Sequence, residues 1–264
     1  MKLGAQLFSI RDFIQTPEDT LETFRRMAAI GYENVQFSGG GPIPAQTLRE
    51  ICDESGMEIA LTHTEQARIL EDTDAVIAEH RLFRCPVIGM GMMPKEFRGS
   101  QAGFDAFKKA LETPVKKILD AGLHFAYHNH AFELQTSKDG GARILDRMLD
   151  ECPDWQIILD VCWVQFGGGD VLHYLEKAGG ARLVNIHYKD MLAEPVHTEG
   201  KADRPDFVPC GEGVMDFVSI TKKCEALGVK NVFVEQDNAV NKPDPFDEMA
   251  RSFRNLRPII AKEV

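Results

Sequence analysis

The chain has 264 residues, of which 44% are hydrophobic and 27% charged, and its formal net charge is −11. These values are ordinary for a globular protein, and the length suits one large domain. The acidic balance argues against a nucleic acid or an anionic membrane as partner, because either would require a basic face. The amino terminus resembles a strand rather than a signal peptide, and no apolar run is long enough to span a membrane. The six cysteines form no CxxC pair, which favours reduced thiols and a cytoplasmic location.

Short apolar runs alternate with helical patterns along the whole chain. The strands are expected at Lys2–Phe8, Asn34–Phe37, Glu58–His63, Pro86–Met92, Leu123–His130, Gln156–Val161, Arg182–Tyr188 and Asn231–Gln236. The first helix should start at Thr16, before a proline and two acids, and stop at Gly31. Further helices are expected at Pro44–Ser55, Ile69–Arg84, Gln101–Ala121, Ile144–Cys152, Val171–Ala178, Met215–Leu227 and Pro245–Ala261, with Pro114 marking a kink or break.

Eight strand–helix units in sequence predict parallel strands joined by crossover helices. Eight such units in this length match a single (β/α)8 TIM barrel covering residues 1–264. An open, doubly wound sheet is the alternative, but it usually has a glycine-rich turn after its first strand. Here that turn reads QLFSIRD. The long connection Met191–Gly213 has no regular pattern, and because it follows the seventh strand it should lie over the active-site face.

Polar side chains follow almost every predicted strand. They are Gln6, Gln36, His63, His128, His130, Glu133, Asp160, His187 and Glu235. The carboxyl ends of barrel strands meet at one face, which is where barrel enzymes carry their active sites. Carboxylates and imidazoles together suit a divalent cation of the Mn, Mg, Co or Zn group. We therefore expect a metal-centred site to which the last four strands contribute.

Two further features allow a functional and a structural interpretation. The stretch Gly167–Asp170 precedes a helix and could cradle a phosphate, although an N-cap role for Asp170 is the preferred interpretation. Aromatic residues near strand ends could stack on a sugar ring or simply form the wall of a pocket. These residues are Phe8, Phe37, Trp163 and Phe166.

The strings YHNHAFEL, LDVCWVQFGGGD, NIHYKDM, GEGVMDF and FVEQD resemble the sugar phosphate isomerase/epimerase family of the xylose-isomerase-like TIM barrels. The resemblance implies one divalent metal, most often Mn, bound by Asp160, His187, Glu235 and a glutamate from the fifth strand region. In the ketose epimerases of this superfamily that glutamate lies near the position of Tyr127 or His128. Here the nearest glutamate is Glu133, which we predict as the first ligand, with a fifth-strand histidine as the alternative.

The resemblance further implies a sugar isomerase or epimerase that acts on a ketose, keto-sugar or related polyol by proton transfer through an enediolate. Expected catalytic residues are Glu133, Glu235, His128, His130 and Lys189, and expected substrate contacts are Gln6, His63, Trp163 and Asp190. The partner would be a small sugar or cyclitol, with homo-oligomerisation left open. Alternatives are a lyase or dehydratase of a keto-glycoside or cyclitol, and a sugar-binding barrel with a degenerate site. An endonuclease-IV-like phosphodiesterase fits the acidic composition badly.

Overall fold

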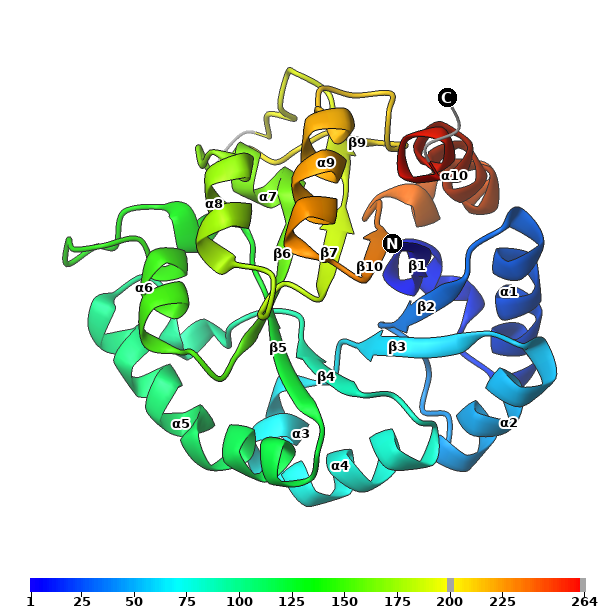
Figure 1. Cartoon of the computed structure of the whole chain (residues 1–264), viewed down its shortest axis with the longest axis horizontal. Helices are drawn as coiled ribbons and strands as arrows, with labels where there is room; N and C mark the ends of the chain where they lie inside the picture. Colours follow the sequence, from blue (N-terminus) through cyan, green and yellow to red (C-terminus); the bar gives the residue numbers. More distant parts are fainter. Residues whose placement is uncertain (199–201, 262–264) are drawn as a thin grey trace.

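The computed structural model describes residues 1–198 and 202–261. Within these ranges eight parallel strands form one sheet that curls into a nearly closed barrel, with the helices arranged around it (Figure 1). The strands are β1 (Lys2–Gln6), β2 (Asn34–Phe37), β3 (Glu58–Thr62), β4 (Val87–Met90), β5 (His124–His128), β6 (Gln156–Asp160), β7 (Asn185–Tyr188) and β10 (Asn231–Val234). The predicted (β/α)8 fold class is thus confirmed.

The hydrogen-bonded strand order is β3-β2-β1-β10-β7-β6-β5-β4, so the sheet begins and ends at neighbouring strands. Between β3 and β4 there is an isolated bridge from Thr64 to Met90, and the Thr64 amide donates to the carbonyl of Gly89 at 2.8 Å. This contact brings the two edges of the sheet together.

Helices follow the strands in the predicted alternation. The α-helices are α1 (Pro17–Ile30), α2 (Ala45–Ser55), α3 (Gln66–Glu71), α4 (Thr73–Leu82), α5 (Gln101–Asp120), α6 (Ile144–Glu151), α7 (Val161–Phe166), α8 (Val171–Ala178), α9 (Phe217–Leu227) and α10 (Pro245–Ala261). Short 3-10 helices are η1 (Leu7–Phe13), η2 (Lys95–Phe97), η3 (Ala131–Leu134) and η4 (Ala239–Asn241). In the part of the chain that the structure describes, no helix is long and apolar enough to cross a membrane.

Three predicted elements differ in the structure. The helix expected at Ile69–Arg84 is divided into α3 and α4, because Asp72 adopts φ −133° and ψ 38°, outside the helical region. Of the kink or break expected at Pro114, the break is absent, since residues 101–120, all of them described, form one helix. The segment Met191–Gly213 is not wholly irregular: β8 (Asp190–Met191) pairs antiparallel with β9 (Phe207–Val208). Residues 199–201 of that segment lie outside the described ranges.

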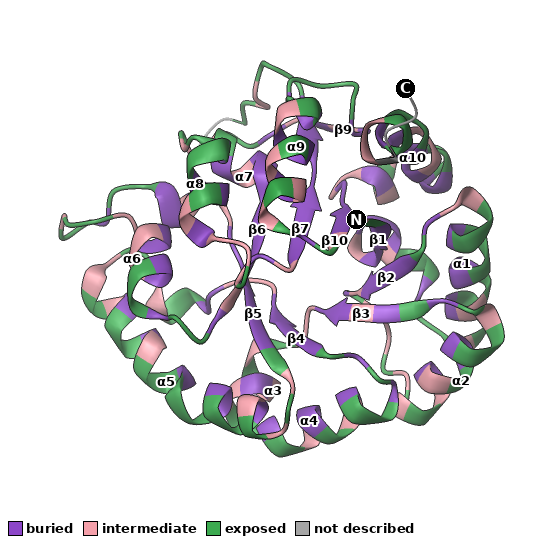
Figure 2. Cartoon of the chain, viewed as in Figure 1, coloured by how far each residue is buried: buried purple, intermediate pink, exposed green. Residues whose placement is uncertain are grey.

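Apolar side chains fill the space on both sides of the sheet. Figure 2 shows buried strands surrounded by helices with one buried and one exposed face, the pattern of amphipathic helices packed on a sheet. A separate apolar group from five strands fills the barrel interior: Leu61, Val87, Ala126, Ile158 and Phe233. A Cβ on Gly4 would lie 2.8 Å from the Phe233 ring, so the absence of a side chain there leaves room for this aromatic ring.

Candidate active site

Four side chains that can bind a cation meet at the carboxyl ends of β5, β6, β7 and β10. They are His128, Asp160, His187 and Glu235, all of them buried. One possible ligand atom from each lies within 4.8 Å of those of the other three. Bonds of about 2.0–2.2 Å to a divalent ion place the ligand atoms about 3–4 Å apart, so small side-chain movements close this group around one ion. Two imidazoles and two carboxylates suit Mn, Co, Zn or Fe.

The strands place these residues side by side. Asp160 ends β6 and stands directly beside His187 of β7 in the parallel register. Along β7, His187 and Lys189 share a face because side chains alternate across a strand. The His187 ring is held from two sides, since its Nδ1 lies 2.9 Å from Glu235 Oε2 and its Nε2 lies 2.6 Å from Gln36 Oε1. The strand register therefore fixes the position of this imidazole, and the two side-chain contacts fix its orientation.

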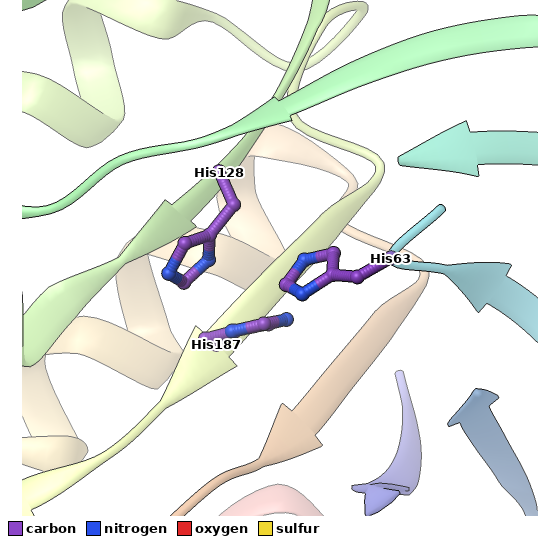
Figure 3. Close-up of side chains that lie close together, drawn as sticks. All are labelled: His63, His128 and His187. Carbon is purple, nitrogen blue, oxygen red and sulfur yellow. The ribbon is translucent and has the colours of Figure 1, made fainter. Parts of the chain in front are cut away.

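A third histidine, His63, lies just after β3 and faces the same space. The rings of His63, His128 and His187 point toward one another (Figure 3), with centroid separations of 4.6–5.6 Å. His63 Nε2 and His128 Nδ1 are buried and lack a hydrogen-bond partner among the described residues. An unpaired buried ring nitrogen is costly, and a bound cation or substrate would satisfy it. These residues therefore fit a metal ion.

Lys189 is the internal counter-ion of the site and is only 1% exposed. Its Nζ lies 3.1 Å from Asp160 Oδ2, 2.9 Å from Glu235 Oε2 and 3.0 Å from Asp237 Oδ1. Burial alone would lower the pKa of Lys189, but the three carboxylates raise it well above its usual value. Lys189 is therefore held as a positive charge between three carboxylates.

The acids around Lys189 differ in pKa. Burial would raise the pKa of Glu235, but Lys189 and His187 together hold it below its usual value. Burial raises the pKa of Asp160, and it raises that of Asp237 to about 6. Glu235 is accordingly the carboxylate kept ionised most firmly.

Glu133 lies apart from this cluster. Its Oε1 accepts a hydrogen bond from the Tyr127 hydroxyl at 2.5 Å and its Oε2 accepts one from the His130 amide at 2.9 Å. Burial raises the pKa of Glu133 to about 8. Tyr127 belongs to the face of β5 that packs on the outer aromatic core, beside Trp155, and η3 folds Glu133 back toward it. The structure therefore brings His128, and not Glu133, together with Asp160, His187 and Glu235.

A cavity of about 790 Å³ opens above the cluster. The predicted catalytic and substrate-contact residues that line it are His63, His128, His130, Trp163, Lys189 and Glu235. Desolvation lowers the pKa of His130 to about 3, so its ring is neutral. Phe207, from the segment that follows β7, packs on Trp163 with ring centroids 5.5 Å apart, as expected for a loop over this face. Another cavity of about 770 Å³, at the opposite end, is lined by residues such as Asn34, Asn185 and Asn231.

Two predicted substrate contacts have structural partners instead. Gln6 contacts His63 and its own neighbouring backbone. Its Nε2 lies 3.4 Å from His63 Nδ1, and its Oε1 accepts a hydrogen bond from the Phe8 amide. Asp190 is fully buried and accepts hydrogen bonds from four backbone amides, those of Met191, Gly211, Gly213 and Met215. Neither side chain lines the cavity.

Two residues with a part in the site, Asn129 and Asp237, were not predicted, and Gln36 was predicted only as a polar side chain at a strand end. Gln36 orients His187, and the Asn129 side chain accepts from the Asp160 amide at 2.9 Å. Asp237 lines the cavity and pairs with Lys189. Its position two residues after Glu235, on the same side of an extended chain, was a usable signal.

A parallel barrel whose strand ends gather imidazoles and carboxylates in one cavity defines a TIM barrel with a candidate metal centre at its carboxyl-end face. The chain belongs to the xylose isomerase-like TIM barrel family, whose model matches residues 24–258. A search of curated proteins finds no match.

Solved structures share the fold at low sequence identity. A sugar phosphate isomerase/epimerase from Parabacteroides distasonis is 20% identical with a TM-score of 0.78, over 98% of this chain and 100% of that one. A probable 3-DHS dehydratase involved in petrobactin synthesis from Bacillus anthracis is 15% identical with a TM-score of 0.72, over 97% and 99%. The IolI protein, whose crystal structure contains a zinc atom, is 13% identical with a TM-score of 0.72, over 100% and 99%.

Proposed function

We propose that the chain is a divalent-metal-dependent sugar isomerase or epimerase. The observation that carries this proposal is the group formed by His128, Asp160, His187 and Glu235 at the base of a large cavity. These four residues would hold the ion, with Mn preferred and Mg, Co or Zn as alternatives. A bound divalent ion supplies Lewis acidity that stabilises negative charge developing on a substrate oxygen.

The chain's own residues supply the proton transfer. Glu235 lines the cavity and is kept ionised by Lys189 and His187, so it can accept a proton from the carbon beside a carbonyl. His130 lines the same cavity as a neutral imidazole whose Nδ1 lacks a partner among the described residues. After removing the proton, Glu235 is a carboxylic acid and can return the same proton to the neighbouring carbon, which gives isomerisation through an enediolate. Epimerisation would require His130 to take a proton from solvent first and then deliver it to the opposite face. Glu133 has no place in this scheme, because both its oxygens are engaged elsewhere.

A lyase or dehydratase of a keto-glycoside or cyclitol is the alternative. Loss of a leaving oxygen in such a reaction would be assisted by a protonated imidazole in the cavity. Burial lowers the pKa of His128, and desolvation lowers that of His130, so neither ring carries that proton near pH 7. This favours isomerisation, in which Glu235 returns the proton that it removed.

Calorimetric titration with Mn²⁺ tests the ion-binding group. The wild type should bind one equivalent, and Asp160→Asn, His187→Ala and Glu235→Gln should each weaken binding strongly. Glu133→Gln is the matched control and should bind as the wild type does. If the wild-type protein binds no Mn²⁺, Co²⁺, Zn²⁺ or Mg²⁺, the proposed metal-dependent function is refuted.

Incubation of the Mn²⁺-loaded protein with ketoses, keto-glycosides and cyclitols in deuterated water tests the reaction. Nuclear magnetic resonance should show deuterium at the carbon next to the carbonyl. Products that retain every substituent indicate isomerisation or epimerisation, whereas loss of a β-substituent indicates the lyase.

A further inference from the structure

The charges that face the cavity are mostly negative. Among the described residues that line it, the charged ones are Glu65, Lys189, Glu235 and Asp237. The ammonium group of Lys189 is already shared between Asp160, Glu235 and Asp237. A divalent ion and Lys189 together would carry a positive charge equal to the negative charge of these three carboxylates. Among the described lining residues no positive charge is left over for an anionic substrate, and Glu65 adds a further negative charge.

Backbone amides at helix N-termini are the other common phosphate ligands in such barrels, especially after the last strands. Here aspartates cap these ends. Asp216 accepts from the Ser219 amide of α9 at 3.0 Å, and Asp244 accepts from the Phe246 and Asp247 amides of α10 at 3.0 and 3.2 Å. Each carboxylate accepts the hydrogen bonds that a bound phosphate would need, and its negative charge repels a phosphate group.

The helix that follows the Gly167–Asp170 stretch is also capped by an aspartate. The Asp170 side chain accepts from the Leu172 and His173 amides at 2.9 and 3.2 Å, which is the N-cap role preferred from the sequence. The first turn of α8 is therefore occupied as well.

Arg11 lies close to the cavity wall without lining it. Its Nη1 donates to the carbonyls of Phe8 and Asp237 at 2.9 and 3.2 Å, and its guanidinium lies 4.3 Å from the centroid of the Phe8 ring. These contacts hold the guanidinium behind the lining residues Phe8 and Asp237.

Aromatic rings form much of the rest of the cavity. Phe8, Phe37 and Trp163 line it from three separate strand ends. Trp163 is braced by the rings of Phe166 and Phe207, 6.0 and 5.5 Å away. Rigid aromatic faces bind the apolar C–H faces of sugar rings without charge.

Together these features point to the substrate class. The geometry indicates that the site takes an uncharged, unphosphorylated carbohydrate, held by aromatic faces and the central cluster. This inference rests on the proposed function and specifies its substrate, in contrast to the sugar phosphates that the name of one structural neighbour mentions.

Matched pairs of ligands test the inference. The fluorescence of Trp163 reports binding to Mn²⁺-loaded protein, and Trp163→Phe shows which part of the signal comes from the cavity, since Trp155 is buried in the core. The probes are D-fructose with D-fructose 6-phosphate and D-ribulose with D-ribulose 5-phosphate. We expect the neutral ketose of a pair to bind about tenfold or more tightly than its phosphate, because like charges repel across the cavity. Tighter binding of either phosphate, or no binding by either neutral ketose, overturns the inference.

Two variants sharpen the test. Glu65→Lys places a cation on the cavity wall and should strengthen binding of the phosphates about fivefold, with the neutral ketoses unchanged. Arg11→Met should change neither class, and a selective loss of phosphate binding in that variant would reveal a phosphate site and overturn the inference.

Deuterium exchange on the same pairs separates this inference from the proposed function. Faster exchange of a phosphorylated ketose contradicts the substrate class while the proton-transfer function stands. Preferential binding of the neutral ketoses with no exchange in any of them supports the substrate class and counts against the isomerase.

Discussion

Glu133 and Asp160 are both buried acids near the ends of barrel strands, yet their partners differ completely. Asp160 faces Lys189 across 3.1 Å, whereas Glu133 is bonded to a tyrosine hydroxyl and a backbone amide. Since no ammonium or guanidinium group among the described residues pairs with Glu133, desolvation dominates and raises its pKa from 4.5 to about 8. Buried carboxyl groups near strand ends thus serve two different purposes in this protein.

This shift predicts a pH dependence of stability. The unfolded chain releases the Glu133 proton near pH 4.5, and the folded protein keeps it up to about pH 8. The stability that protonated Glu133 contributes is therefore fully present below pH 4.5 and is lost as the pH rises through about 8. Glu133→Gln should remove this loss, so its free energy of unfolding should fall less than that of the wild type between about pH 5 and pH 8. Urea denaturation at both pH values measures this, and equal changes would contradict the assigned environment.

Lys189 gives a second prediction at this scale. Lys189→Met leaves Asp160, Glu235 and Asp237 without their counter-ion, so the free energy of unfolding should fall by about 3–5 kcal/mol. Added Mn²⁺ should restore more stability to this variant than to the wild type, because the ion neutralises the same carboxylates. Thermal unfolding with and without Mn²⁺ measures both effects.

A surface lysine supplies the matched control. Lys223 pairs with Glu176 at 3.1 Å on the exterior, and Lys223→Met should cost less than about 1 kcal/mol. Similar losses in the two variants would mean that Lys189 is not the counter-ion of a buried site.

At the scale of elements, the connection between β7 and α9 is organised by one side chain. Asp190 accepts four backbone hydrogen bonds from both ends of this connection. Gly213 approaches it so closely that an added Cβ would lie 2.3 Å from Asp190 Oδ1. The connection is thus anchored at its two ends, next to the ring of Phe207 that supports Trp163.

Two substitutions should loosen this connection in the same way. Asp190→Ala removes the common acceptor, and Gly213→Ala displaces it. Each should reduce the free energy of unfolding by about 2–4 kcal/mol, because buried amides lose a charged partner. Limited proteolysis should cut within residues 191–216 in both variants before it cuts the wild type there. Val218→Ala, at an exposed position of α9, is the control, and resistance of Asp190→Ala to early cleavage would refute the anchoring role.

At the scale of the whole molecule, the site stands on an apolar layer that fills the barrel. Phe233 is fully buried in this layer, and its ring packs edge-on against His187 with centroids 6.3 Å apart. Below it, Asn34 donates to Asn231 and Asn231 donates to Asn185, so side-chain hydrogen bonds join three strands at the other end. The barrel interior is therefore a packed core that supports the polar cluster.

Truncation of this layer should affect the site as well as the fold. Phe233→Ala should lower the free energy of unfolding by about 3–5 kcal/mol through the cavity it leaves. It should also weaken Mn²⁺ binding, because the His187 ring loses its support. Phe253→Ala, which truncates a ring packed on Tyr32 outside the barrel, should lose stability but keep Mn²⁺ affinity. Equal Mn²⁺ affinities in the two variants, measured by calorimetry, would contradict this coupling.

The sequence alone determined the order of elements and the chemistry at the strand ends. Alternation of strand and helix patterns is a local property, and so is the exit of a polar residue from an apolar run; both predicted the barrel and the approach of Asp160, His187 and Glu235. Only the tertiary structure decided that Glu133 turns to Tyr127, that Lys189 bridges three acids, and that Asp190 anchors a connection. These contacts join residues from different elements, and their distances depend on strand register and packing, which no local pattern encodes.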